Sequence, residues 1–484
     1  MEIHKSEVFT LMKSIFFLLL LVPLFTPLSG QSTQQYEINI SIPELKDSTL
    51  YLAYHYGDKQ YIKDTLYLDN KGNGTFSGTE SLPKGIYLIV LPGNSYFEIL
   101  ASDDRFFSVS CSYPDYISTL NFKSSSENSA FLDYQRKWES YQLEASSLSK
   151  RAQNNRDNND SLRILNTMLG DKEREMKDYL KEVVKDNQPN LLSVLVKSVI
   201  PIEIPEPVIP AGSTNPDSIR WYFRYNYNKD HFWDNIDLTD ERLLRTPILQ
   251  SRLETFFSNI VIQSPDSINK EIDKIIDKCE PQHDMFQYIS VFLFNKYRSS
   301  EIMGQDAVLY KIAKDIYLSG KADWVSDEFL EDLNREVELM SNNLIGMKAK
   351  DLVMNTYNNF YVSLYDVQKE FTILYFWEPN CGYCKTTTPK LIEYYETAKN
   401  DGIEVFAVCT TDDKEEWEKY IQDNNITWIN GWDPDRATHF DYYYNVQATP
   451  LIYILDSNKT IIAKKLAVED LASFISNYRR IMGK

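Results

Sequence analysis

The sequence predicts a multidomain α+β protein with an N-terminal antiparallel β-sandwich-like domain, a central all-α region and a C-terminal α/β domain. Three observations lead to this fold class. Short alternating runs fill residues 31–126, apolar residues three and four apart dominate residues 127–343, and strand-like and helix-like runs alternate across residues 344–484. The chain has 484 residues, 43% of them hydrophobic and 13% aromatic, which is enough to bury several cores.

Residues 1–30 are predicted to be a secretory signal peptide. Lys13 precedes an apolar run at residues 15–22, and the small residues Ser29 and Gly30 lie just before a polar stretch. The apolar run is too short to span a bilayer comfortably, so an uncleaved anchor is the weaker interpretation. We therefore expect a periplasmic or otherwise exported protein with no stable membrane insertion after cleavage.

The charge balance excludes some partners. The chain carries 70 Asp and Glu against 51 Lys and Arg, a formal net charge of −19. No basic excess is left for nucleic acid or an anionic membrane, so neither is expected to be a partner. Five cysteines are few for an exported protein, so we do not expect a disulfide framework to stabilise the fold.

The N-terminal domain is predicted from alternation and turns. Polar and apolar residues alternate over residues 36–42 and 49–54, and turn residues gather at residues 69–74, 83–85 and 92–94. Short strands at this spacing favour a small antiparallel sandwich or barrel. Nothing in residues 31–126 has the spacing of a catalytic site.

The central region is predicted to be helical. Apolar residues recur at helical spacing over residues 130–149, 160–185, 242–262, 268–278, 285–297, 307–317 and 326–340. Four prolines divide this region into two parts: Pro201, Pro205, Pro207 and Pro210. Residues 151–160 are polar enough to form a solvated loop or a frayed helix end.

The C-terminal domain carries the chemistry. Strands are expected over residues 360–364, 372–377, 403–409, 451–455 and 460–463, and helices over residues 384–398, 414–422 and 468–479. This order predicts a mostly parallel sheet with its site at a strand's carboxyl end. Cys381 and Cys384 lie there, between a strand and a helix. Their spacing allows a disulfide, and the helix N-terminus favours a thiolate on Cys381.

Further residues around this pair point to a family. With Trp377 before the first cysteine, Pro389 after the second, and Thr449-Pro450 further on, residues 344–484 resemble the thioredoxin superfamily. Within it they are most similar to the TlpA/ResA-type thiol-disulfide oxidoreductases of bacterial envelopes. The β-rich and helical parts resemble uncharacterised modules found ahead of such domains. The resemblance implies a thioredoxin-like fold, no cofactor, disulfide-containing envelope proteins as partners, and a membrane-embedded electron donor.

The cysteines are expected to have different roles. Cys381, exposed at the helix start, is predicted to be the attacking nucleophile. Cys384, one turn further and more buried, is predicted to resolve the mixed disulfide. The two residues form the predicted redox-active disulfide.

The remaining site residues are expected to shape the surface around the cysteines. Trp377 is predicted to pack beneath them, and Pro389 to kink the helix by removing a backbone donor. A cis Pro450 is predicted to face the cysteines and leave the backbone around Thr449 free to pair with a substrate strand.

Two positions depart from the family pattern. Tyr375 stands where many thioredoxins carry a buried acid, and Thr387 stands where ResA-like proteins often carry a glutamate. The sequence therefore identifies no proton acceptor for Cys384, and Glu378 is only a candidate.

A metal site is the less favoured interpretation of the cysteine pair. A CxxC can be half of a zinc site, but the chain has no second pair, and Cys111, Cys279, Cys409 and His439 are scattered. Cys409 is expected to be a buried, inert thiol. A bridge from Cys111 to Cys279 is disfavoured because the two lie in different predicted domains.

The sequence thus predicts an exported thiol-disulfide oxidoreductase, with reduction of envelope protein disulfides as the leading activity. A disulfide oxidase or isomerase is the alternative within this class. A peroxidase is disfavoured because no Pro-x-x-x-Thr-x-x-Cys run precedes a helix. The protein could instead be chiefly a partner-binding module with a secondary redox domain, but an intact CxxC together with Thr449-Pro450 argues against decay.

Overall fold

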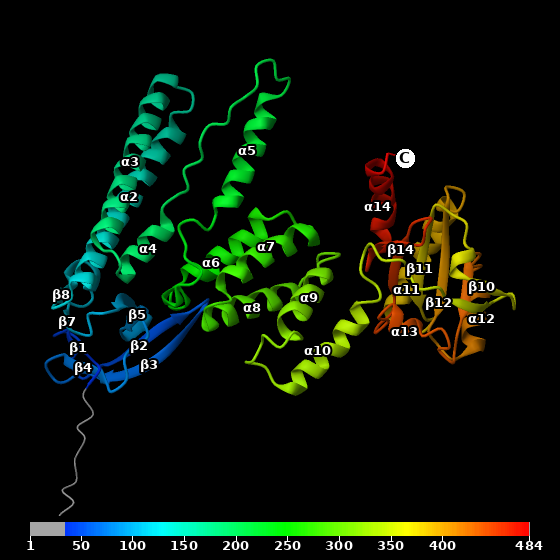
Figure 1. Cartoon of the computed structure of the whole chain (residues 1–484), viewed down its shortest axis with the longest axis horizontal. Coiled ribbons are helices and arrows are strands. Elements are labelled where there is room, and N and C mark those ends of the chain that lie inside the picture. Colours follow the sequence, from blue (N-terminus) through cyan, green and yellow to red (C-terminus); the bar gives the residue numbers. More distant parts are fainter. Residues whose placement is uncertain (1–33, 484) are drawn as a thin grey trace, which may run out of the picture.

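The computed structural model describes residues 34–483, and the predicted signal peptide at residues 1–30 lies outside this range. A β-rich part, a helical part and an α/β part follow one another along the chain and along the long axis of the molecule (Figure 1). The fold class expected from the sequence is confirmed. Within residues 34–483, none of the helices has both the length and the apolar character needed to cross a membrane.

The β-rich part consists of two four-stranded sheets. One sheet has the order β4-β1-β7-β8 and the other β3-β2-β5-β6. Buried residues of both sheets, among them Ile38, Leu52 and Phe107, share one core. The strands are β1 (Tyr36–Ser41), β2 (Thr49–Tyr56), β3 (Lys59–Tyr67), β4 (Asn73–Gly78), β5 (Gly85–Val90), β6 (Tyr96–Ala101), β7 (Phe106–Ser110) and β8 (Asn121–Lys123), with the short turns η1 (Pro92–Asn94) and α1 (Tyr116–Thr119) between them.

One strand pair corrects the expectation of a fully antiparallel sandwich. β1 pairs with β4 in antiparallel orientation but with β7 in parallel orientation. All four strands of the second sheet lie between β1 and β7 in the chain, with β4 of the first sheet between β3 and β5. Alternation along a strand reports which side chains are buried, not the direction of its neighbour, so the sequence pattern could not predict this pair.

The central part is helical between residues 126 and 340. A long antiparallel pair, α2 and α3, stands beside the β-rich part, and α5 projects from the body next to it (Figure 1). Ser125 and Asn158 cap the starts of α2 and α3 with their side-chain oxygens. The elements are α2 (Ser126–Asn154), α3 (Asn159–Asp186), α4 (Leu191–Val199), α5 (Pro216–His231), η2 (Glu241–Arg245), α6 (Ile248–Thr255), η3 (Phe256–Ile260), α7 (Pro265–Cys279), α8 (His283–Arg298), α9 (Asp306–Ile312), η4 (Ala313–Tyr317) and α10 (Asp327–Met340).

The expected helix over residues 242–262 is three pieces instead. The 3₁₀ turn η2 ends at Arg245, its cap residue Thr246 is extended, and α6 begins after Pro247. Proline disfavours the helical conformation in the residue before it, which explains the break. α6 then passes into the π-helical turn η3.

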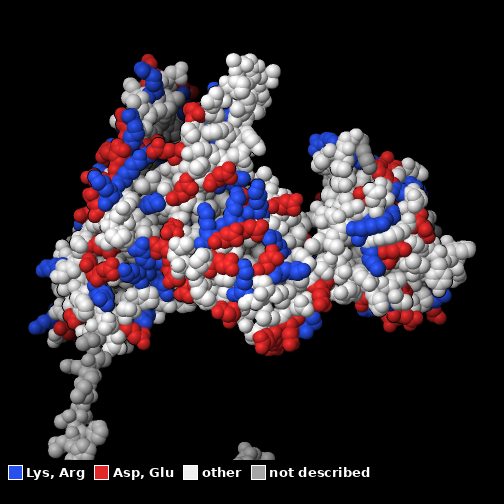
Figure 2. Space-filling view, viewed as in Figure 1, with Lys and Arg blue, Asp and Glu red and all other residues white. Residues whose placement is uncertain are grey.

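The surface of the central part carries mixed charge. On the face in Figure 2, acidic and basic side chains intermingle over the body of the helical part. The projecting end of α5 is largely uncharged on the same face. α5 has no fully buried residue, and Ile219, Phe223 and Tyr227, spaced four residues apart, are only half-buried.

The C-terminal part is one seven-stranded sheet, ordered β10-β9-β13-β12-β11-β14-β15, with helices packed on it. Alternate residues of β11 enter two different cores: Ile373 and Tyr375 one core, Leu374 and Phe376 the other. The elements are β9 (Val353–Thr356), β10 (Tyr361–Ser363), η5 (Leu364–Asp366), β11 (Phe371–Trp377), α11 (Gly382–Ala398), β12 (Ile403–Cys409), α12 (Lys414–Asp423), β13 (Ile429–Trp432), α13 (Phe440–Tyr443), β14 (Leu451–Leu455), β15 (Ile461–Lys464) and α14 (Val468–Ile481).

This sheet is mixed, so the expectation of a mostly parallel sheet was wrong. Only the neighbours β11, β12 and β13 run parallel, and the outer strands on both sides pair in antiparallel orientation. The β14–β15 and β9–β10 hairpins supply these outer strands. The β11–α11–β12 crossover nevertheless places the start of α11 at the carboxyl end of β11.

A buried lysine joins the helical part to the C-terminal sheet. Lys464 on β15 pairs with Asp306 of α9 and donates hydrogen bonds to the carbonyl and side-chain oxygens of Asn343, at 2.9 and 3.0 Å. Asn343 in turn donates to the Tyr443 carbonyl. A buried ammonium needs such partners, so this contact fixes where the two parts meet.

Candidate active site

The two cysteines lie where β11 ends and α11 begins. All seven residues of β11 are buried between the two cores of the sheet, so the strand holds the following turn in place. Cys381 is the N-cap residue of α11, and its Sγ accepts a hydrogen bond from the Cys384 backbone N–H at 3.1 Å. Both residues are free thiols in the structure. The motif therefore presents one thiol at the helix start and the other one turn inside.

The two thiols differ in exposure. Cys381 is partly exposed, whereas Cys384 is 1% exposed and packs in the core beneath the site. In its thiol form Cys381 donates to the Thr449 carbonyl at 3.1 Å. An incoming disulfide therefore reaches Cys381 more readily than Cys384.

The surroundings of the two thiols also give them different pKa values. Burial acts to raise the pKa of Cys381, but hydrogen bonds from Cys384, Thr449 and the backbone at the helix start outweigh it, so its pKa is lowered. Burial, together with the hydrogen bond to Cys381, raises the pKa of Cys384 to about 12. The thiolate therefore forms first on Cys381.

The loop before β14 faces the cysteines. The Thr449–Pro450 peptide bond is cis, as the sequence analysis expects. Through its carbonyl oxygen, Thr449 contacts Cys381, and through its hydroxyl it donates to Glu378 Oε1 at 3.4 Å. Residues almost seventy positions apart in the sequence thus form one surface.

Aromatic side chains form the floor of the site. Trp377 is fully buried and stacks on Tyr375, with ring centroids 6.4 Å apart, and it contacts Tyr420 in a tilted arrangement with centroids 5.1 Å apart. The Tyr375 hydroxyl pairs with Thr388 Oγ1 at 2.8 Å, and burial raises the pKa of Tyr375. A neutral hydroxyl therefore occupies the position where many thioredoxins carry an acid.

The remaining predicted residues lie around this centre. Pro389 is inside α11, directly after the buried Thr388. Asn380, which was not among the predicted site residues, is exposed and bonds to Glu416 of α12. Cys409 ends the neighbouring strand, and burial raises its pKa to about 12.

The other cysteines stay apart from this site. Cys111 and Cys279 are buried free thiols in the β-rich and helical cores, and burial raises the pKa of each to about 12. Over residues 34–483, no three His, Cys, Asp or Glu side chains gather in an arrangement that could hold a metal ion.

A dithiol at a helix start, a cis-proline loop against it and a central β11–α11–β12 unit define the thioredoxin-like class. Comparison with known proteins agrees: residues 345–464 match the model of the AhpC/TSA family. The C-terminal domain of this chain is a thioredoxin-like domain of that family, and the protein is a thiol-disulfide oxidoreductase. Residues 36–131 and 167–343 each match a family described as a domain of unknown function, DUF4369 and DUF5106 respectively.

Individual relatives each match less than a third of the chain. The thiol-disulfide oxidoreductase ResA of Geobacillus kaustophilus is 26% identical over 141 residues, which are 28% of this chain and 78% of the relative. A domain of a possible thiol-disulfide isomerase from Cytophaga hutchinsonii is 40% identical, covering 29% of this chain and 96% of that one, with a TM-score of 0.28. The thioredoxin domain of a Bacteroides vulgatus thiol-disulfide oxidoreductase is 25% identical, covering 28% and 96%, with a TM-score of 0.27.

Proposed function

We propose that the protein is an exported reductase of disulfides in envelope proteins, in which Cys381 attacks and Cys384 resolves. One observation carries the proposal. The exposed sulfur of the pair has the lowered pKa, and the sulfur beneath it is buried with a pKa of about 12. This difference supports attack by Cys381 and release by Cys384.

The exchange proceeds in two balanced steps. The Cys381 thiolate attacks one sulfur of a client disulfide, which forms a bond between the two proteins and releases the other client sulfur as a thiolate that takes up a proton. Cys384 then loses its proton and attacks Cys381 Sγ, which forms the intramolecular disulfide and releases the second client thiol. The client gains two electrons and the cysteine pair loses two. A membrane-embedded dithiol donor returns them, as the ResA resemblance implies.

The neighbouring residues assist these steps. Trp377 closes the floor beneath the cysteines, and Pro389 leaves α11 one backbone donor short near the buried end of the motif. The loop at Thr449 and Pro450 holds the client backbone over Cys381. Glu378 is the candidate acceptor for the Cys384 proton, and its carboxylate accepts a hydrogen bond from the Thr449 hydroxyl beside the cysteine pair.

One observation favours the alternative direction. The lowered pKa of Cys381 stabilises its thiolate, and therefore the reduced form of the pair. A more stable reduced form makes a stronger oxidant, as in disulfide oxidases and isomerases. The reductase direction therefore depends on the ResA resemblance, and the oxidase or isomerase remains the second candidate.

Alkylation at one sulfur should abolish the activity. In the pre-reduced chain, brief iodoacetamide treatment is expected to label Cys381 alone. The labelling rate should reach half its maximum at a pH below about 8.5, the pKa of a free thiol, because the pKa of Cys381 is lowered. Peptide mass mapping measures the labelling, and reduction of an insulin-type disulfide measures the activity. Activity should be lost at the same rate as Cys381 is labelled. Labelling that starts at Cys384 or Cys409, or activity that survives full labelling of Cys381, would overturn the assignment.

A further inference from the structure

β3 is an open sheet edge. It lies at the end of the order β3-β2-β5-β6, and among residues 34–483 it pairs with β2 alone. On its other side, the backbone groups of this nine-residue strand find no backbone partner in the described part of the chain. An unpaired row of N–H and C=O groups of this length is a template for another extended chain.

β3 carries exposed apolar side chains among the charged residues Lys59, Lys63 and Asp64. Ile62 is 64% exposed and Tyr67 is 75% exposed. The opposite half of the sheet is different, because Ile86 of β5 and Leu100 of β6 are buried against the helices in one cluster. The helices thus cover one half of the sheet and leave the β3 half open.

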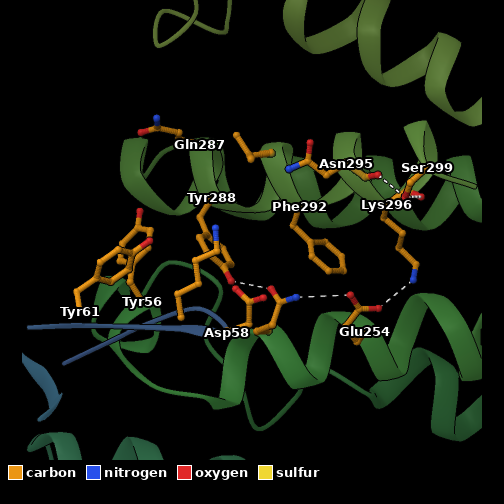
Figure 3. Close-up of a pocket in the computed structure, with 13 residues that line it drawn as sticks. Tyr56, Asp58, Tyr61, Glu254, Gln287, Tyr288, Phe292, Asn295, Lys296 and Ser299 are labelled. Atoms are coloured by element: carbon orange, nitrogen blue, oxygen red, sulfur yellow. Dashed lines mark hydrogen bonds and ion pairs between the residues drawn. The ribbon is translucent and has the colours of Figure 1, made fainter. Parts of the chain in front are cut away.

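A groove continues from the start of β3. We call it the hairpin groove: a cavity of about 640 Å³ between the tip of the β2–β3 hairpin, α6 and α8 (Figure 3). Lys59 and Tyr61 belong both to β3 and to the groove lining. The groove is lined by Tyr56, Asp58, Lys59, Tyr61, Gln250, Glu254, Gln287, Tyr288, Val291, Phe292, Asn295, Lys296 and Ser299.

The tip of the hairpin is fixed against α8. Gly57 has a φ of +62°, and its N–H donates to the Leu244 carbonyl at 3.0 Å. A Cβ at this position would lie 1.9 Å from the Tyr288 hydroxyl, so only glycine allows this approach. Tyr288 donates to Gln250 Oε1 at 2.6 Å. These contacts hold one end of the groove open in a defined shape.

The lining suits a peptide backbone. Lys296 pairs with Glu254 at 2.9 Å at the far end (Figure 3). In the described part of the chain, the side-chain amides of Gln287 and Asn295 make no hydrogen bond to protein. A primary amide matches the donor and acceptor of a peptide group, and Phe292 and Tyr61 supply apolar contact.

We propose that the β3 edge and the hairpin groove together bind an extended segment of a client polypeptide by strand addition, at a site separate from Cys381 and Cys384. The inference rests on the proposed function, because it takes the clients to be proteins. The edge supplies backbone hydrogen bonds, and the groove holds the residues that run past Lys59.

A second copy of the chain fits this site less well. If β3 paired with β3 of another copy, the partner strand would leave the edge at Leu68, which is buried in its own core. At its other end, the strand is preceded by the hairpin tip, which packs on its own α8. Neither end of such a strand can continue into the groove.

Binding can be measured without thiol chemistry. The full chain carrying Cys381→Ser and Cys384→Ser is titrated against fluorescein-labelled lactalbumin that has been reduced and carboxymethylated, so that it is unfolded and free of thiols. Fluorescence anisotropy should show saturable binding. Ile62→Lys with Tyr67→Lys should weaken it at least about tenfold, and Gln287→Ala with Asn295→Ala at least about fivefold.

A matched control distinguishes binding at this site from nonspecific binding to exposed apolar residues. Tyr361 is 77% exposed on β10, an edge strand of the seven-stranded C-terminal sheet. Tyr361→Lys should leave the dissociation constant within about twofold of that of the unsubstituted surface. Equal binding by all variants, or equal loss in the Tyr361→Lys control, would overturn the proposal. The proposal would also be overturned if sedimentation showed a dimer of the chain and the Ile62→Lys and Tyr67→Lys substitutions dissociated it. Failure of the pre-reduced wild-type chain to react with dithiobisnitrobenzoic acid, with polypeptide binding intact, would count against the proposed redox function and support a separate binding site.

Discussion

In a Cys384→Ser variant, client proteins should remain covalently attached to Cys381. The mixed disulfide still forms, because Cys381 stays partly exposed at the helix start, where the backbone N–H groups of residues 383 and 384 still act to lower its pKa. It is not resolved, because the buried second sulfur is missing. Turnover should fall more than about a hundredfold. Extracts of the envelope should show a ladder on non-reducing gels, and a thiol reductant should remove it.

Two further variants control this experiment. Cys381→Ser should trap far less, because Cys384 is buried and its pKa of about 12 leaves little thiolate at neutral pH. Cys409→Ser should behave as the wild type, because this thiol is buried and its pKa is also about 12. A ladder with Cys381→Ser as strong as with Cys384→Ser would contradict the assignment of the attacking sulfur.

Removing Trp377 should have the largest effect on stability. This side chain is fully buried between Tyr375 and Tyr420. Trp377→Ala should therefore lower the free energy of unfolding of the C-terminal part by about 3–5 kcal/mol. Hydrogen exchange of peptides from β11 and β14 measures this locally, without assuming that the whole chain unfolds in one step.

Phenylalanine is the matched control for this position. The Trp377 Nε1 has no hydrogen-bond partner in the described part of the chain. Trp377→Phe therefore keeps most of the apolar volume and loses no hydrogen bond, so it should cost less than about 1.5 kcal/mol. Equal protection from exchange in the alanine and phenylalanine variants would show that packing at Trp377 does not support the sheet.

The sequence predicted the active-site segment best because its signals are local. Residues 371–377 are apolar except for Thr372, and such a run predicts a strand buried on both faces. The CxxC follows at once, and a helix begins there. Thr449-Pro450 was recognisable from the family pattern, although only the fold brings Thr449 to 3.1 Å from Cys381.

Other elements left no local signal. β13 is four residues long and contains Asn430 and Gly431, so no apolar run marked it. Gly431 is needed because a Cβ there would lie 2.2 Å from the Met354 sulfur, a neighbour on β9 that sequence spacing does not reveal. α5 carries several aromatic residues around the helix and buries none of them fully. A single apolar face with helical spacing therefore did not stand out in the sequence.

The hairpin groove was equally hidden. Its lining comes from residues 56–61, 250–254 and 287–299, which lie in two separately predicted regions. None of these segments has a motif, and their meeting depends on Gly57 packing against Tyr288. A site built from such contacts can be found only once the arrangement of the two regions is known.

The reduction potential of the Cys381–Cys384 pair is the measurement that tests the central proposal most directly. Equilibration of the full chain with glutathione or dithiothreitol buffers, followed by mass determination after alkylation, gives the potential. A reductase of envelope disulfides requires a value of about −250 mV or lower. A value near about −120 mV would contradict the reductase assignment and identify the protein as an oxidant of its clients.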